Sequence, residues 1–593
     1  MRLPQRVRFI TLALLLVAGF TPALAQKGKL EINYTVALTD TAAQQFHITT
    51  EIKNIDQPRL DLALPTWTPG WYTVENYAKN ILRFKVSDGV GKTLPLTMSR
   101  KQTWNVDTRN LSSIKVEYDY SATVLALNQA RIAPDFSYFI GTAVFLEPVG
   151  HRSTPSSLRF QLPQGWKVIT PLKDTADPTV FTAADYDTLV DAPAEMGKFD
   201  MTKFEVDGKP HYFVANPVGS FSAEKTKQFV EMLQKVARAE SAVFGDLPYE
   251  KYVYYYFFRS AESNSSGALE HLNSFVAFAP PGDYATPQGL IGTAAHEFFH
   301  LWNVKRLRPA EMWPYDYSRE NETPLLWVSE GFTNYYSALT LYRAGINTEK
   351  EFLERRMSVA AGIEGNDVRN YISPASSSVS TWIGYDTPQA FEISYYAQGE
   401  NLGALLDLSI RHDTAGRAGL DDVMRTLYND FYKRGKGFTT DDMIKVVNSI
   451  TKKDYQDFYR RYVFGTDVPD YAAIYGYAGF KVEQKTGASP EFGFDGRFRD
   501  NGLYVLLIDN GGPAAKAGLL KDDVINTVDG QPVRAVDLDS LAGKTLKLSV
   551  QRDGSVIDVP YTVGSRATNF YAVSDMPNPT SEQRKVREAW LKR

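Results

Sequence analysis

The chain has 593 residues, of which 43% are hydrophobic, with a formal net charge of −4 and an isoelectric point near 6.1. This balance of charge, without a basic tract, argues against a nucleic-acid partner. The absence of cysteine excludes disulfides and thiol catalysis, so the stability must come from buried apolar surface.

The first 25 residues have the pattern of a secretory signal peptide. Three arginines precede an apolar run from Phe9 to Phe20, and Ala23-Leu24-Ala25 is a small-x-small cleavage site. The run is too short for a membrane-spanning helix, and no later stretch reaches about 18 apolar residues. We therefore expect cleavage after Ala25, export to a bacterial periplasm, and no membrane-spanning segment.

Residues 26–218 are predicted to form an N-terminal β-rich domain. In the segments 31–36 and 46–52, apolar and polar residues alternate with a period of two, as in half-buried strands. Clusters of Pro, Gly, Asn and Asp separate such segments. The pattern is typical of a sandwich or an open β-domain.

From Ser222 to Phe244 the pattern becomes helical, and Tyr252–Phe258 then reads as an aromatic strand. A second helix is predicted from Thr286-Pro287, which supplies a capping hydroxyl and a proline at the first helical position. Its basic residues before Pro309 suit the end of a helix. A further helical part extends to Tyr462.

The motif His296-Glu297-Phe298-Phe299-His300 lies on the second of these helices. Residues i and i+4 share one face of a helix, so both imidazoles can bind one zinc ion. Glu297 then lies where it can take a proton from a zinc-bound water. The alternative is a helix that carries His and Glu on its solvent face, but this helix is too apolar for that, and burying these groups without a metal is costly.

A catalytic zinc usually has three protein ligands, and Glu330 is our candidate for the third. It lies among Trp327, Val328 and Phe332, in a helical pattern that starts at Thr323-Pro324. The alternative is that Glu330 is an ordinary surface glutamate of a helix. The glutamates nearer to His300 lie in a proline-containing loop (Glu311, Glu320 and Glu322). We expect one Zn²⁺ per chain.

The HExxH motif followed by residues 327–332 resembles the gluzincin metallopeptidases. More specifically, most of the chain resembles the glycyl aminopeptidase family, peptidase family M61. Residues 64–72 with Tyr77-Ala78 resemble its N-terminal signature, and residues 266–271 resemble its Gly-x-x-Glu-His segment. Residues 394–399 resemble a Tyr-x-Lys-Gly segment of related aminopeptidases, with Gln398 in place of the usual lysine. Ala268 stands where the family often has glycine.

The resemblance implies roles for further residues. Glu270 is expected to bind the free α-ammonium of a peptide, while the backbone of Gly267 and Ala268 lines the peptide. His271 either orients Glu270 or is a packed histidine. The donor to the oxyanion is expected to be Tyr396, with Tyr395 as the second choice. Asn334, one helical turn after Glu330, is a candidate to support a zinc ligand.

Residues 483–566 resemble a bacterial PDZ domain, and Phe492-Gly493-Phe494 resembles the loop that binds a peptide's terminal carboxylate. The alternative is a closed groove that only buttresses the catalytic domain. Residues 567–593 are expected to form a C-terminal tail, with a short charged helix from Ser581.

Together these features predict a multidomain fold. A β-rich N-terminal domain is followed by a thermolysin-like α+β zinc peptidase domain with a helical C-terminal part (219–482) and by a small PDZ β-domain. The predicted function is that of an exported zinc aminopeptidase that removes Gly or Ala from peptides with a free N-terminus, through a zinc-bound water activated by Glu297. The alternatives are a zinc endopeptidase with an open cleft, and a PDZ-bearing peptide binder with a relic metal site.

Overall fold

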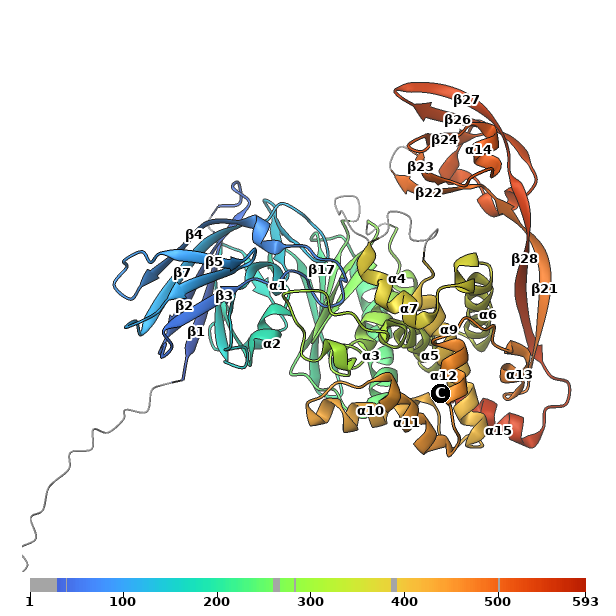
Figure 1. The fold of residues 1–593 in the computed structure, drawn as a ribbon, viewed down its shortest axis with the longest axis horizontal. Helices are drawn as coiled ribbons and strands as arrows, with labels where there is room; N and C mark the ends of the chain where they lie inside the picture. The colour runs from blue at the N-terminus through green and yellow to red at the C-terminus, as the bar shows by residue number, and fades with distance from the viewer. Residues whose placement is uncertain are drawn as a thin grey trace, which may run out of the picture.

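The computed structural model describes residues 29–38, 40–259, 267–281, 284–384, 392–499 and 502–592. The predicted signal peptide lies outside them. An N-terminal β-rich region, a mixed catalytic unit and a small C-terminal β-domain follow one another along the chain (Figure 1). The predicted fold class is confirmed.

The N-terminal region contains three sheets. Apolar side chains alternate with polar ones along its long strands and point into the core, as the sequence predicts. The first sheet has the order β13 (Lys173–Asp174), β14 (Val180–Ala183), β11 (Ser156–Gln161), β1 (Glu31–Ala37), β2 (Gln45–Lys53), β7 (Ser113–Ser121) and β4 (Ile81–Asp88). The second has the order β10 (Glu147–Pro148), β3 (Arg59–Ala63), β6 (Thr103–Asp107) and β5 (Leu96–Arg100). The third has the order β12 (Lys167–Ile169), β15 (Ala194–Gly197), β9 (Phe136–Phe139) and β8 (Ala130–Ile132).

The catalytic unit begins with a five-stranded sheet. Its order is β16 (Asp200–Val206), β17 (Lys209–Asn216), β18 (Tyr252–Phe257), β20 (Ser274–Phe278) and β19 (Gly267–His271). The strands β17, β18 and β20 are parallel, and β19 is an antiparallel edge strand. Because β16 and β17 pair into this sheet, the catalytic unit starts near Asp200, earlier than the boundary at residue 218 that we predicted.

Helices form the rest of the catalytic unit. The helix α3 (Ala223–Phe244) starts at Ser222, whose hydroxyl accepts from the Lys225 N–H, and it ends at Gly245 with a left-handed φ of 88°. The other helices of this unit are α4 (Pro287–Phe299), α5 (Thr333–Arg343), α6 (Glu349–Glu364), α7 (Pro374–Ser380), α9 (Tyr395–Asp413), α10 (Leu420–Asp430), α11 (Thr440–Thr451), α12 (Gln456–Tyr462) and α13 (Tyr471–Gly476).

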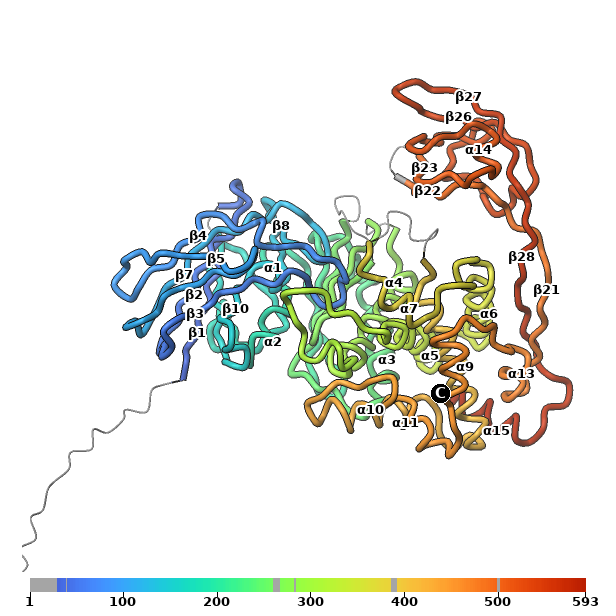
Figure 2. The backbone as a smooth tube through the Cα atoms, viewed as in Figure 1, coloured from blue at the N-terminus to red at the C-terminus, as the bar shows by residue number. Residues whose placement is uncertain are grey.

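A two-stranded ribbon connects the C-terminal β-domain to the catalytic unit (Figure 2). It consists of β21 (Phe480–Glu491) and β28 (Gly564–Asp575). The β-domain between them contains α14 (Pro513–Ala517) and the strands β22 (Phe494–Arg499), β23 (Gly502–Ile508), β24 (Val524–Val528), β25 (Gln531–Pro532), β26 (Thr545–Arg552) and β27 (Ser555–Thr562).

The C-terminal segment returns to the catalytic unit. The helix α15 (Ser581–Trp590) buries Trp590 completely, and the Trp590 indole N–H donates to the Tyr335 hydroxyl at 2.8 Å. The charged helix that we expected from Ser581 is therefore present, but residues 567–593 complete the ribbon and the catalytic core instead of forming a separate tail.

One continuous apolar core extends through the N-terminal region, the catalytic unit and α15, whereas the C-terminal β-domain has its own core. Among the described residues, no helix combines the length and apolarity that a membrane crossing requires.

Candidate metal centre

The helix α4 carries the HExxH motif and ends earlier than we predicted. The Thr286 hydroxyl caps it by accepting from the Gly289 N–H at 3.0 Å, and its last residue is Phe299, so His300 lies at its C-terminal end. The basic residues that we placed on the last turn of the helix lie in the turns that follow it, where Lys305 and Arg306 are buried and Arg308 is half-buried. Lys305 pairs there with Asp191 at 2.7 Å, and Arg306 donates to the Leu301 carbonyl at 2.8 Å.

The three predicted zinc ligands converge. The Nε2 atoms of His296 and His300 lie 3.0 Å apart, and Glu330 Oε2 lies 3.1 Å from His300 Nε2 and 3.5 Å from His296 Nε2. His300 Nδ1 donates to the Asn303 carbonyl at 3.0 Å, which leaves the lone pair of Nε2 directed at the centre. Two imidazole nitrogens and one carboxylate, all within 4.8 Å of one another, fit zinc.

Glu330 lies in the π-helix η3 (Trp327–Phe332), which precedes α5; π-turns within helices are frequent at functional sites. The Asn303 amide holds this turn, because it donates to the Val328 and Ser329 carbonyls at 2.9 and 3.0 Å. Asn303 thus orients His300 with its backbone and the Glu330 segment with its side chain. No motif in the sequence marks Asn303 as a functional residue, and its only local signal is a polar amide three residues after His300.

Two glycines bring α9 against η3. A Cβ on Gly331 would lie 2.3 Å from Gly399 Cα, and a Cβ on Gly399 would lie 1.9 Å from the Trp327 carbonyl oxygen. The two backbones therefore touch, which explains glycine at both positions. This contact places the predicted tyrosines beside the centre.

The Tyr396 ring stacks on the His296 ring, with 6.0 Å between their centroids. The Tyr395 hydroxyl instead forms a hydrogen bond with the Thr381 hydroxyl at 3.1 Å. This arrangement favours Tyr396 as the phenol that faces a substrate. Asn334 lies beside His296, where we expected a supporting residue.

Carboxylates surround His300. Ligand atoms of Glu270, Glu297 and His300 also lie within 4.8 Å of one another. Burial raises the pKa of Glu270 to about 7 and the pKa of Glu297 well above its usual value. Burial lowers the pKa of His300, but Glu330 and Glu270 outweigh it, so the pKa rises to about 10. This concentration of negative charge suits a bound cation.

Glu270 and Glu297 each have one buried carboxylate oxygen without a hydrogen-bond partner among the described residues (Glu270 Oε1 and Glu297 Oε2). Glu270 is on the edge strand β19, whose backbone, including Gly267 and Ala268, is placed where an extended peptide could pair. His271 points away from Glu270, because neighbours on a strand face opposite sides, and its Nδ1 lies 3.5 Å from Asp191. The position of His271 therefore favours the packed histidine over a residue that orients Glu270.

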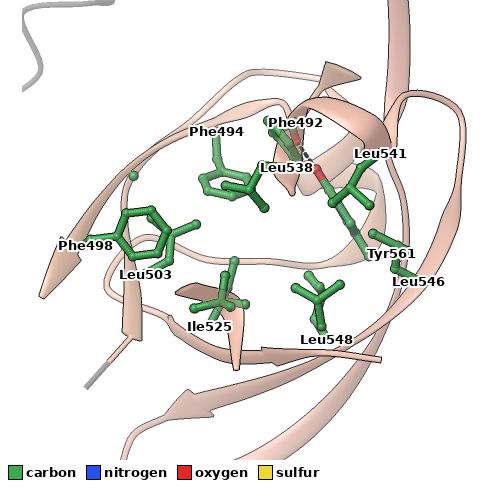
Figure 3. Close-up of a pocket in the computed structure, with 13 residues that line it drawn as sticks. Phe492, Phe494, Phe498, Leu503, Ile525, Leu538, Leu541, Leu546, Leu548 and Tyr561 are labelled. Atoms are coloured by element: carbon green, nitrogen blue, oxygen red, sulfur yellow. Dashed lines mark hydrogen bonds between the residues drawn. The ribbon is translucent and has the colours of Figure 1, made fainter. Parts of the chain in front are cut away.

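The C-terminal β-domain contains an apolar cavity of about 200 Å³ beside the predicted carboxylate loop (Figure 3). Phe492 and Phe494 line the cavity, and Gly493 adopts a left-handed φ of 68° between them. The Phe492 carbonyl accepts a hydrogen bond from the Tyr561 hydroxyl. The strand β22 is the edge of the sheet next to this cavity.

Three family models match the chain. The model of the peptidase M61 N-terminal domain matches residues 33–198, that of M61 glycyl aminopeptidase matches residues 289–402, and a PDZ domain model matches residues 476–563. The chain belongs to the M61 glycyl aminopeptidase family. The M61 glycyl aminopeptidase model includes both the HExxH motif and Glu330, and the PDZ model includes the cavity of Figure 3.

Solved structures and one curated protein are also similar to this M61 chain. An aminopeptidase N family protein from Idiomarina loihiensis has a TM-score of 0.82 at 24% identity, covering 95% of this chain and 100% of that one. An M1 zinc metallopeptidase from Deinococcus radiodurans has a TM-score of 0.47 at 14% identity, covering 74% and 95%. The magnetosome formation protease MamE of Paramagnetospirillum magneticum is 34% identical over 89 residues, 13% of this chain, and the match spans only 12% of that protein.

Proposed function

We propose that this M61 protein is a zinc aminopeptidase that removes a small N-terminal residue from peptides. One observation carries the proposal: the Glu270 carboxylate lies beside the metal centre, is 4% exposed, and has one oxygen to which no described residue forms a hydrogen bond. A buried acid there can bind the free ammonium of a substrate through a charge-assisted hydrogen bond. The preference for Gly or Ala rests on the resemblance of the sequence.

Each residue of the centre has a distinct task. A zinc ion held by His296, His300 and Glu330 would act as a Lewis acid and lower the pKa of a coordinated water. Glu297 accepts a proton from the attacking water and returns it to the departing amine when the C–N bond breaks. A carboxylate whose pKa is raised by burial is suited to carry that proton. The Tyr396 phenol donates to the developing oxyanion.

The test compares free and blocked substrates. Alanyl- and glycyl-naphthylamide should be cleaved, and a chelator should stop the reaction, whereas the N-acetylated forms should remain intact. Equal cleavage of acetylated peptides would instead indicate an endopeptidase. No cleavage of either form, by protein that contains zinc, would indicate a peptide binder with a relic site.

We also propose that the PDZ domain binds a peptide C-terminus and that the protein is exported to the periplasm. The apolar cavity and the edge strand β22 support the first proposal, and the sequence of residues 1–25 supports the second. Binding of a peptide with a free C-terminus, but not of its amide, tests the first. N-terminal sequencing of periplasmic protein tests the second, which predicts a start at Gln26.

A further inference from the structure

A turn of the N-terminal region reaches the metal centre. The 68–72 turn (Thr68 to Tyr72) is closed by the Trp71 N–H, which donates to the Thr68 carbonyl at 3.1 Å. The two residues before the turn anchor it to the catalytic unit: the Thr66 N–H donates to the Tyr317 carbonyl at 2.8 Å, and the Trp67 indole N–H donates to the Asp316 carbonyl at 2.9 Å. These two bonds tie the start of the turn to the catalytic unit.

Gly70 lies directly against the Glu270 carboxylate. A Cβ at this position would be 2.6 Å from both Glu270 oxygens and 2.7 Å from the Leu269 side chain. The backbone of Gly70 therefore covers one side of the carboxylate, and ligand atoms of His300 and Glu297 lie within 4.8 Å of a carboxylate oxygen of Glu270. No further atom fits between Gly70 and this side of the carboxylate.

Tyr72, at the end of the turn, contacts the metal centre at Glu330. Its hydroxyl donates to Glu330 Oε1 at 3.5 Å, and its ring lies edge-on to Trp382 with 5.7 Å between the centroids. The second oxygen of Glu330, Oε2, is the one that faces the two imidazoles. The phenol is 8% exposed, so it contacts the carboxylate in a water-poor environment. A hydrogen bond to the outer oxygen of a ligand orients that ligand.

We propose that the 68–72 turn is part of the active site, with Tyr72 as a positioning residue for Glu330 and Gly70 as the barrier behind Glu270. This proposal rests on the proposed function, since it explains how the site admits a free N-terminus and stops a longer chain. The N-terminal region thus contributes to both the zinc affinity and the exopeptidase specificity of the site.

The Tyr72→Phe variant tests the first part. The ring and its packing on Trp382 remain, but the hydroxyl is lost, so zinc should be lost to a competing chelator at about tenfold lower chelator concentration. The matched control is Tyr77→Phe, which removes the hydroxyl of another buried tyrosine of the same region, one that donates to the Asn128 carbonyl at 2.9 Å. The control should bind zinc like the wild type. Equal zinc affinity of Tyr72→Phe and the wild type would overturn this part.

The Gly70→Ala variant tests the second part. Its Cβ displaces the Glu270 carboxylate, so KM for alanyl-naphthylamide should rise about tenfold or more while the zinc content stays at that of the wild type. The control is Gly91→Ala, at a turn with a similar positive φ (+90° against +93°) but with no atom within 4 Å of the added Cβ. An unchanged KM in a folded Gly70→Ala protein would overturn the barrier.

These outcomes are separable from a failure of the proposed function. If the wild type cleaves acetylated and free substrates equally, the aminopeptidase proposal fails, and the zinc affinity of Tyr72→Phe still tests the positioning role. If Gly70→Ala does not fold, the wild-type protein is tested with alanyl-alanyl-naphthylamide instead. A barrier behind Glu270 predicts that single alanines are released from this substrate, and release of the intact Ala-Ala dipeptide would overturn the barrier.

Discussion

The N-terminal β-rich region and the PDZ domain are both connected to the catalytic unit, but in different ways (Figure 1). The N-terminal region shares a continuous core with the catalytic unit and sends the 68–72 turn to the metal centre. The PDZ domain has a core of its own and is connected through the ribbon of β21 and β28. The first region is thus built into the catalytic structure, whereas the second is a module that can act separately.

The largest effect on activity should follow from replacing the proposed base, Glu297, in the catalytic unit. In Glu297→Gln the amide cannot accept the proton of the attacking water, so kcat should fall by about 10³-fold, while the zinc content and PDZ peptide binding stay unchanged. Steady-state kinetics with alanyl-naphthylamide check this prediction. Wild-type turnover by this variant would show that Glu297 is not the base.

The second prediction concerns α15, which follows the PDZ domain in the sequence but packs in the catalytic core. Trp590→Ala should destabilise the catalytic unit by about 3–5 kcal/mol, because it leaves a cavity and removes one of the hydrogen bonds of the Tyr335 hydroxyl. The loss in the free energy of unfolding is measured by denaturant-induced unfolding. Phe570→Ala on the ribbon, where Phe570 is 44% exposed, is the control and should cost less than about 1 kcal/mol.

The pH dependence of KM distinguishes the charged centre from the apolar PDZ cavity. Glu270 must be ionised to bind an ammonium, and burial raises its pKa to about 7. A bound dication favours the ionised form, so KM should rise as the pH falls through a pKa at or below about 7, by up to about tenfold per pH unit. Glu270→Gln should lack this acidic limb. If the variant retains the limb, another group is responsible for it.

Several elements could be predicted from the sequence because their signals are local. The capping residues Ser222 and Thr286 mark the starts of α3 and α4, and the spacing of His296 and His300 places both rings on one face. The end of α4 could not be predicted in this way. Lys305 turns inward to Asp191, which lies 114 residues earlier in the chain.

The contribution of the N-terminal region to the site also has no local signal. Tyr72 and Glu330 are 258 residues apart in sequence, and nothing near Gly70 indicates that its missing side chain makes room for the Glu270 carboxylate. Residues 64–72 resemble a family signature, but the sequence does not predict their contacts. Those contacts are formed only when the N-terminal region packs on the catalytic unit.

The smallest effect is expected from removing the PDZ domain. Residues 492–563 can be replaced by a short turn that joins β21 to β28, because these strands pair along their whole length. The rate of alanyl-naphthylamide cleavage should then change by less than about twofold, and the free energy of unfolding of the catalytic unit by less than about 1 kcal/mol. A large loss of either would show that the domain is not a separate module.

The most direct measurement is elemental analysis of the folded protein after dialysis, beside the variants His300→Ala and Glu330→Ala. The account predicts one zinc ion per wild-type chain and a sharp loss of zinc in both variants. A folded wild-type protein that retains no zinc, or variants that retain it as well as the wild type does, would contradict the assignment of His296, His300 and Glu330 as a metal centre.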